Sequence, residues 1–369
     1  MCQGDAPFSE RPQLNPTSPL AKQAAIAGKM TQVQSSIDHA MRKAALLYNP
    51  DSGGSSKRRQ SELESVVSLL RNAGVEAQLV LNHSREEAEE KARQAVLAGC
   101  DTVFACGGDG TIHNIVQVLA NTPVALAVLP MGTANALAHD LGLPMHAVEA
   151  TRAVLHGNLR RIALGYVQYL DLNGQPGCRY FVIAAGIGVD AHLFYRLGTG
   201  TKRRLGMAAY YAKAWHLWFT YHMQRFQVEA NETGSHHPRC AEVTELLAVR
   251  VSNFGGVLQK LAPGASLDRD DLRLIGCRTA SRFAYLSYVT RALLRGHWTV
   301  AGIDLSHAGK AVCQYLPAPP NSSNSSSAQP RIKIFVEADG ELLGTLPAEI
   351  TVVPDALTLI APAPMDLVR

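Results

Sequence analysis

The stretch CGGDGT, residues 106–111, follows directly on a short apolar run at 102–105 and precedes a helix-like segment. A second stretch, PMGTAN at 130–135, has an apolar run at 124–129 before it and a helix-like segment after it. Short apolar runs that alternate with helix-like segments predict a doubly wound parallel sheet. Since such sheets bind ligands at the carboxyl ends of their strands, both glycine-containing turns are predicted to lie at a ligand-binding edge.

The first of these stretches has the chemistry of an anion-binding turn. Glycines lack a Cβ atom, so backbone N–H groups can approach phosphate oxygens, and a helix that begins near Thr111 adds its positive N-terminal end. Asp109 lies in the middle of this turn, where a lone carboxylate would repel a phosphate unless a divalent cation lay between them. The residues therefore predict a polyphosphate site at which Asp109 holds Mg²⁺. An ordinary tight turn remains the alternative.

A third apolar run, residues 44–48, ends in the turn NPDSGG at 49–54 and precedes a helix-like stretch at 56–71. Three such turns in one sheet face the same edge, so their backbone donors and hydroxyl groups can share one ligand. The sequence therefore predicts a nucleotide-binding α/β region.

Five short segments, in this order along the chain, resemble the catalytic family of the diacylglycerol kinases, bacterial lipid kinases that are related to sphingosine and ceramide kinases. The segments are Asn49-Pro50 with Ser52-Gly53, GGDGT at 107–111, GTAN at 132–135 with DLG at 140–142, GIGVDA at 186–191, and DGE at 339–341 with Leu346-Pro347. Each segment is weak alone, but together they are specific, and the match runs from about residue 42 to the C-terminus.

The resemblance implies an ATP-dependent lipid kinase that transfers the γ-phosphate to a lipid hydroxyl with the help of Mg²⁺. Diacylglycerol is the first expected acceptor, with phosphatidic acid as product, and a sphingoid base, a ceramide or a polyprenol is the alternative. NAD kinases share the GGDGT turn and a related fold, so this motif does not separate them. A catalytically silent nucleotide-binding protein is a further alternative.

The resemblance also implies roles for individual residues. Glu341 is the expected proton acceptor, Asp109 is expected to orient the metal and the phosphate group, and Asn135 to brace its turn. Asn82 stands where many members carry Thr. The residues expected at the nucleotide are Asn49, Pro50, Ser52, Gly53, Asn82, Gly107, Gly108, Gly110, Thr111, Thr133 and Asn135.

Two further carboxylates are expected near the acceptor. Asp339 is separated from Glu341 by one glycine, which suggests a tight turn that presents both side chains to one cleft. An ordinary hairpin turn is the alternative for this Asp-Gly pair. The resemblance places Asp190 near the acceptor hydroxyl, and capping of a helix that begins at Ala191 is an equal alternative.

A second metal position is implied by a Leu-x-x-Asp-Gly-Leu pattern that holds a structural Mg²⁺ in the family. The matching stretch here is LDRDDL, residues 267–272, so that Leu267, Asp270 and Leu272 are the candidate ligands. Asp271 replaces the usual glycine of this pattern, so this chain departs from the family here.

Composition favours an enzyme with two domains in a reducing compartment. The chain has 369 residues, 47% of them hydrophobic, and a net charge of +4, which gives no argument for a nucleic-acid partner. Its seven cysteines form no Cys-x-x-Cys pair. No apolar run reaches the length of about 18 residues that a spanning helix needs. We therefore expect a cytoplasmic protein that meets its lipid at the membrane surface. The sequence leaves open whether the protein forms a homodimer.

The expected organisation has three parts: a weakly ordered extension at 1–40, the nucleotide-binding domain at 41–160, and a β-rich, sandwich-like domain at 161–369 whose final segment returns to the first domain in one alternative. Aromatic residues gather at 210–221, and a helical face is expected at 282–298. Both stretches suit either a membrane interface or core packing. The Ser- and Asn-rich stretch at 317–330 is expected to be a loop.

Overall fold

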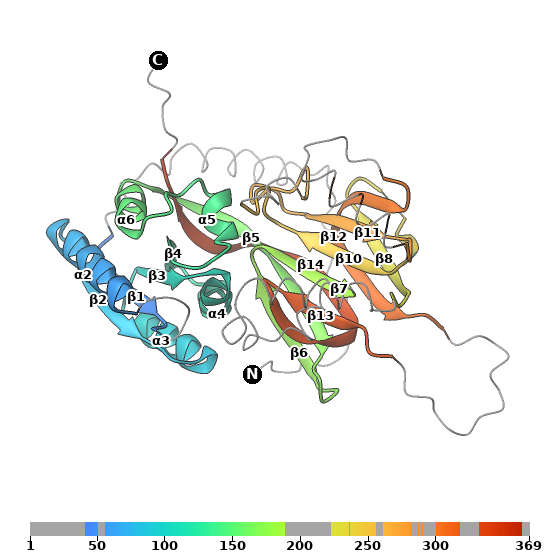
Figure 1. The fold of residues 1–369 in the computed structure, drawn as a ribbon, viewed down its shortest axis with the longest axis horizontal. Helices are drawn as coiled ribbons and strands as arrows, with labels where there is room; N and C mark the ends of the chain where they lie inside the picture. The colour runs from blue at the N-terminus through green and yellow to red at the C-terminus, as the bar shows by residue number, and fades with distance from the viewer. Residues whose placement is uncertain are drawn as a thin grey trace, which may run out of the picture. The chain divides into compact units, whose positions relative to one another are not determined.

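The computed structural model describes residues 41–50, 56–188, 223–235, 237–255, 261–281, 283, 287, 290, 300–317 and 332–363. Within these residues the strands join one hydrogen-bonded sheet in the order β2-β1-β3-β4-β14-β13-β7-β10-β11-β12-β8-β9, and β5 and β6 are attached through β14. Residues 41–369 form one compact unit (Figure 1). The predictions for 1–40 and 210–221 lie outside the described residues, as do residues 318–330 of the predicted loop and all of the predicted helical face at 282–298 except residues 283, 287 and 290.

The first part of this sheet is parallel. It contains β1 (Lys43–Tyr48), β2 (Glu76–Leu81), β3 (Thr102–Gly107) and β4 (Ala125–Pro130). β3 and β4 are buried along their whole length, as expected of central parallel strands that are covered on both faces. The apolar runs of the sequence thus predicted these two strands to within two residues at each end.

Helices connect the parallel strands and cover both faces of the sheet. They are α2 (Ser56–Asn72), α3 (Arg85–Leu97), α4 (Asp109–Leu119), the short α5 (Ala136–Asp140) and α6 (Ala147–Leu155). The chain runs from β1 to β2 in one direction and from β2 to β3 in the other, and right-handed crossovers then place α2 and α3 on opposite faces. Accordingly α2 packs against α6, whereas α3 packs against α4.

The remaining strands pair mostly antiparallel. They are β5 (Asn158–Leu170), β6 (Pro176–Phe181), β7 (Ala184–Gly188), β8 (Phe226–Glu232), β9 (Arg239–Val243), β10 (Glu245–Val249), β11 (Leu272–Cys277), β12 (Ile303–Tyr315), β13 (Phe335–Ala338) and β14 (Glu341–Ala361). Their hydrophobic core, which includes Phe181, Phe226 and Leu272, is separate from the core of the parallel strands. The predicted α/β fold with a parallel first region and a β-rich second region is confirmed.

One strand connects the two regions. β14 is 21 residues long and pairs with β13 near its start, with β12 at Ala348–Thr351, and with β5 over most of its length. Near its end, Thr358 and Leu359 pair in parallel with Ala125 and Leu126 of β4. The last strand therefore begins in the β-rich region and ends inside the parallel sheet.

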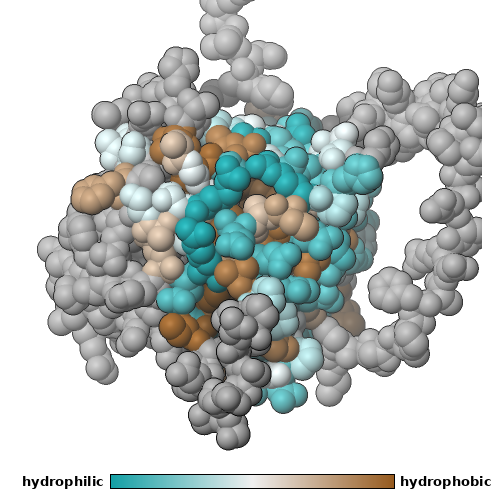
Figure 2. Space-filling model, turned by 90° about the vertical axis from the view of Figure 1, so that its right-hand side faces the viewer, coloured by the Kyte–Doolittle hydropathy of each residue, from teal (hydrophilic) through white to brown (hydrophobic). Residues whose placement is uncertain are grey.

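The far edge of the sheet carries charged side chains. β9 is the edge strand, and its Arg239 and Glu242 make ion pairs with Glu232 and Arg225. Figure 2 shows this end of the molecule, where hydrophilic residues predominate at the centre and hydrophobic residues form separate groups between them. Charged edge strands of this kind oppose pairing with a second sheet. None of the described helices combines the length and the hydropathy that a membrane span requires.

Candidate active site

The strand order places the candidate site at a reversal point of the sheet. In the order β2-β1-β3-β4 the chain changes direction between β1 and β3, and open α/β sheets bind ligands outside the carboxyl ends of such strands. Asn49 follows β1 directly, and Gly107 is the last residue of β3. The turn at 132–134 is exposed and follows β4, so three of the predicted turns lie on one edge.

The glycines allow two of these turns to touch through their backbones. A Cβ atom added to Gly132 would lie 2.4 Å from the Gly108 Cα. A Cβ atom added to Gly107 would lie 2.2 Å from the Thr111 Oγ1. A side chain at position 132 would push the two turns apart, and one at position 107 would displace Thr111. The result is a surface of bare backbone beside the start of α4, as phosphate binding requires.

Asn135 holds the second turn in shape. Its backbone has φ +51°, a left-handed conformation that Asn tolerates better than most residues. Its Oδ1 accepts a hydrogen bond from the Gly132 N–H at 2.8 Å, and its Nδ2 donates to the Gly132 carbonyl at 3.2 Å. The expectation that Asn135 braces this turn is confirmed, while its contact with a nucleotide stays a prediction.

Asp109 is the first residue of α4 and connects the two glycine turns. The backbone N–H groups of Ala136 and Leu137, at the start of α5, favour the charged form of its carboxylate and lower its pKa. Its Oδ1 is buried, and no described group of the structure donates a hydrogen bond to it. Burial and the nearby Asp339 charge raise the pKa of Asp109, although the N–H groups partly oppose this. A buried carboxylate oxygen without a donor is a group that a cation would stabilise.

Glu341 reaches the same edge from the other end of the chain. Its Oε1 would lie 3.1 Å from a Cβ atom added to Gly110, in the first turn of α4. Its Oε2 forms an ion pair with the Arg85 Nη2 at 2.5 Å, and its side chain is 27% exposed. One carboxylate oxygen is therefore held by the protein while the other faces the glycine turn.

Sequence reasoning missed Arg85. It opens α3, directly after the N-cap Ser84, where a positive charge is disfavoured by the helix dipole. This unfavourable position is the one feature of the sequence which indicates that Arg85 has a role outside its own helix. Its partner lies 256 residues away, so no local pattern could identify it.

Asp339 has a different place from the one predicted. It lies in the turn between β13 and β14 with φ +49°, followed by Gly340 at φ +83°, the geometry of a two-residue hairpin turn. Its side chain is 0% exposed and contacts the His113 Nδ1 at 3.2 Å. It also accepts hydrogen bonds from the backbone N–H groups of Val182, Ile183 and Ala184. The Asp339 carboxylate is thus occupied by the protein itself instead of facing a substrate.

Other predicted nucleotide residues lie at or near this edge. Asn49 and Pro50 are half-buried and Thr133 is exposed. Asn82 follows β2 and is buried, and its Oδ1 receives no hydrogen bond from any described residue. Ser52, Gly53 and Asp190 lie outside the described residues, so their roles stay predictions.

The predicted structural metal ligands are Leu267 and Asp270, in the loop before β11, and Leu272, the first residue of that strand, and their metal-binding role stays a prediction. Asp270 is exposed, whereas the Leu267 carbonyl accepts a hydrogen bond from the buried Arg250 at 3.4 Å. No group of three acidic, His or Cys side chains suited to a metal occurs among the described residues. The guanidinium that occupies the Leu267 carbonyl would repel a divalent cation at this carbonyl, which argues against a metal there.

Two family models and several curated relatives match this chain. Residues 43–167 match the family described as the diacylglycerol kinase catalytic domain, and residues 183–361 match the YegS C-terminal NAD kinase beta sandwich-like domain. A diacylglycerol kinase of Bacillus subtilis is 30% identical over 313 residues, which cover 84% of this chain and 93% of the relative. A diacylglycerol kinase of Staphylococcus aureus is 26% identical over 87% of this chain and 93% of its own length.

The fold is similar to that of a solved relative. The crystal structure of a diacylglycerol kinase from Bacillus anthracis superposes with a TM-score of 0.59 at 16% identity, and the match covers 88% of this chain and 97% of that one. Matches that extend over nearly the full length of the relatives, together with both domain matches, show that this chain belongs to the diacylglycerol kinase family.

Proposed function

We propose that the protein transfers the γ-phosphate of ATP to the hydroxyl group of diacylglycerol and so forms phosphatidic acid. Family membership implies a kinase that uses ATP, and the names of the relatives in Bacillus subtilis and Staphylococcus aureus supply the acceptor. The observation that carries the proposal is the position of the Glu341 Oε1 beside Gly110, the residue that follows Asp109 at the glycine-rich edge. A lipid kinase needs both a group for the metal-bound phosphate and a proton acceptor at that place.

The glycine turns and the start of α4 are the proposed phosphate site. Backbone N–H groups at the start of α4, near Gly108 and Gly110, would donate to phosphate oxygens because these glycines carry no side chain. The buried Asp109 Oδ1, which lacks a described donor, would hold Mg²⁺. When bound, this cation supplies the positive charge that phosphoryl transfer requires.

Glu341 is the proposed general base. Its Oε1 faces Gly110, on the side of the phosphate turn, and would accept the proton of the attacking hydroxyl. Arg85 holds Oε2, which fixes the direction of the free oxygen. We therefore assign Arg85 as a positioning residue.

A lipid acceptor requires contact with a membrane surface, and we propose a peripheral contact of the protein with that surface. The cytoplasmic location stays a prediction.

Radiolabelled ATP tests the proposed reaction. The full chain is incubated with Mg²⁺, labelled ATP and mixed micelles that contain diacylglycerol, sphingosine or ceramide, with NAD as a soluble acceptor, and the products are separated by thin-layer chromatography. We expect labelled phosphatidic acid, and none with Asp109→Asn or Glu341→Gln. Label in a sphingoid or ceramide product alone would overturn diacylglycerol as acceptor, and label in NADP alone would overturn the lipid kinase.

A further inference from the structure

Arg250 is a buried cation at the end of β10. It follows Val249 directly, is 0% exposed, and stands first among the largest fully buried side chains of the described residues. Its Nη1 donates to the carbonyls of Arg269 and Asp271, both at 2.6 Å. Its Nη2 donates to the carbonyls of Ala163 at 3.1 Å and Leu267 at 3.4 Å.

Three of these carbonyls belong to one loop, at alternating positions of residues 267–271 just before β11 begins. The fourth belongs to β5. Backbone carbonyls that converge on one point stabilise a cation, and a planar guanidinium can serve several of them at once. Burial lowers the pKa of Arg250 to about 10, which leaves the guanidinium protonated at neutral pH.

The acidic side chains of this loop have other partners or face solvent. Asp268 forms an ion pair with the Arg160 Nη2 at 2.5 Å. Asp271 receives two hydrogen bonds from Arg269 at 2.6 Å, one from the Thr233 hydroxyl at 3.0 Å, and lies 3.2 Å from the His307 Nδ1. Asp270 is exposed. The Arg250 guanidinium is therefore the cation that the loop carbonyls face.

We propose that Arg250 is a built-in structural cation, which holds the loop at 267–271 and makes its folding independent of any divalent metal. This inference rests on contacts of the described residues and does not depend on the proposed reaction. It assigns Mg²⁺ to the candidate active site alone.

The loop is also joined to the candidate active site through the residues that follow Arg250. The Asp140 Oδ1, at the end of α5, accepts hydrogen bonds from the Ser252 N–H at 2.8 Å, the Ser252 hydroxyl at 2.7 Å and the Asn253 N–H at 2.9 Å. A loss of the Arg250 contacts would loosen the segment that supports α5.

The first experiment measures the melting temperature of the full chain with EDTA, Mg²⁺, Mn²⁺ or Ca²⁺. The Asp109→Asn variant is used, so that a metal at the active site does not contribute to the shift. We expect the same melting temperature in all four conditions. A rise with a metal that disappears in the Asp109→Asn/Asp270→Asn double variant would show a metal at the loop and overturn the proposal.

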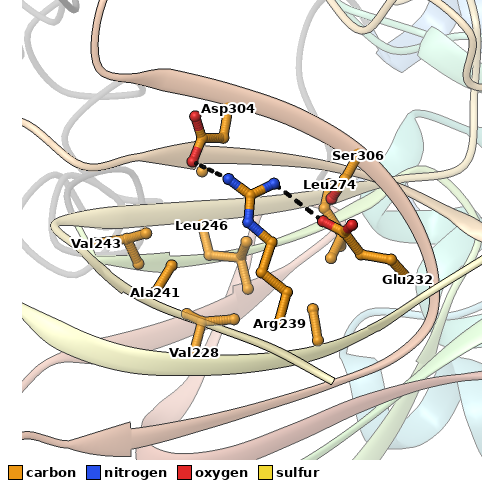
Figure 3. Close-up of a pocket in the computed structure, with 11 residues that line it drawn as sticks. Val228, Glu232, Arg239, Ala241, Val243, Leu246, Leu274, Asp304 and Ser306 are labelled. Carbon is orange, nitrogen blue, oxygen red and sulfur yellow. Dashed lines mark hydrogen bonds and ion pairs between the residues drawn. The ribbon is translucent and has the colours of Figure 1, made fainter. Parts of the chain in front are cut away.

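The second experiment removes the guanidinium and uses Arg239→Met as the matched control. Figure 3 shows Arg239 beside the apolar side chains of Val228 and Leu246, with its guanidinium between Glu232 and Asp304. The two ion pairs measure 3.1 and 3.0 Å, and the Arg239 side chain is 44% exposed. We expect Arg250→Met to lower the melting temperature by many degrees and Arg239→Met by little, because exposed ion pairs contribute little to stability. Equal melting temperatures of Arg250→Met and the native chain would overturn the proposal.

Arg250→Lys decides the question if Arg250→Met does not fold. An ammonium keeps the charge but cannot match four carbonyls with the fixed fork of a guanidinium. We expect a folded variant with a lower melting temperature and faster amide hydrogen exchange at 267–272 than elsewhere in the sheet. Native melting and native exchange in Arg250→Lys would contradict the proposed role of the guanidinium.

Discussion

At the scale of single residues, the two candidate acids of the active site lie in different environments. Asp109 is buried and braced by backbone N–H groups of α5, whereas Glu341 is partly exposed and held through one oxygen by Arg85. The two carboxylates thus differ in environment, as groups that hold a metal and accept a proton need to differ.

Asp109→Asn should separate stability from activity. Because burial raises the pKa of Asp109, the charged form is disfavoured in the folded protein, and the stability that its protonated form provides at low pH is lost as the pH rises. Asn is neutral and keeps an acceptor for the α5 N–H groups. We expect a melting temperature at neutral pH equal to or above the native one, and a loss of turnover of about a hundredfold or more. A lower melting temperature would contradict this account of Asp109.

Arg85→Met should lower kcat without unfolding the protein. Glu341 then loses the contact that directs its free oxygen, and we expect kcat to fall by about tenfold to a hundredfold with a smaller change in the KM for ATP. Arg93→Met on the same helix is the control, since Arg93 pairs only with Glu89 and Glu90 among the described residues. Partial recovery in Arg85→Lys would support the positioning role, and native kcat in Arg85→Met would refute it.

The sequence drew attention to the candidate acids of the active site but not to the arginines that contact remote segments. Asp109 and Glu341 stand inside glycine-containing motifs, which local spacing makes visible. Arg85 and Arg250 are single cations whose partners come from remote segments, so that only the folded chain brings them together. Asp339 was predicted as a substrate residue because one glycine separates it from Glu341. The N–H donors that surround its carboxylate leave no trace in the sequence.

At the scale of elements, the loop that precedes β11 makes the stability of the fold depend on the charge of Asp271. Burial alone would raise the pKa of Asp271, but hydrogen bonds from Arg269 and Thr233 and the charges of His307 and Arg269 lower it to about 2. A carboxyl group with a lowered pKa stabilises the fold above its unfolded value of 3.8, and this stability is lost as the pH falls toward 2.

Urea titrations of the native chain and Asp271→Asn should therefore converge in acid. At pH 5 we expect the native chain to have a larger free energy of unfolding than Asp271→Asn. This difference should shrink by on the order of 2 kcal/mol between about pH 5 and pH 2. Asp270→Asn is the control, because its side chain lies beside Asp271 but is exposed. A difference in free energy of unfolding that does not change with pH would contradict the contacts assigned to Asp271.

The elements also show why some strands could be predicted and one could not. β3 and β4 are uniform apolar runs between glycine turns, and such runs are read directly from sequence. β14 contains Pro347 and Pro354, which argue against a long strand. Its pairing with β5 is interrupted between Thr345 and Glu349 and between Val353 and Leu357, and these irregularities accommodate both prolines.

For the whole molecule, β14 makes the parallel and antiparallel regions depend on each other. Leu359 is fully buried and pairs with Leu126 of β4, far from the turn that carries Glu341. We expect Leu359→Ala to cost about 3 kcal/mol and to shift one calorimetric transition of the whole unit at 41–369 to lower temperature. Two separate transitions, with the β-rich part unchanged, would show that the regions unfold independently.

The central claim is that acids from the middle and the end of the chain face one bound triphosphate. The most direct test is a crystal structure of the protein with Mg²⁺ and a nonhydrolysable ATP analogue. The account predicts the γ-phosphate at the carboxyl edge of β1, β3 and β4, with the metal on Asp109 and the Glu341 Oε1 on the open side of the phosphate. A triphosphate bound at another edge, beyond the reach of either carboxylate, would contradict it.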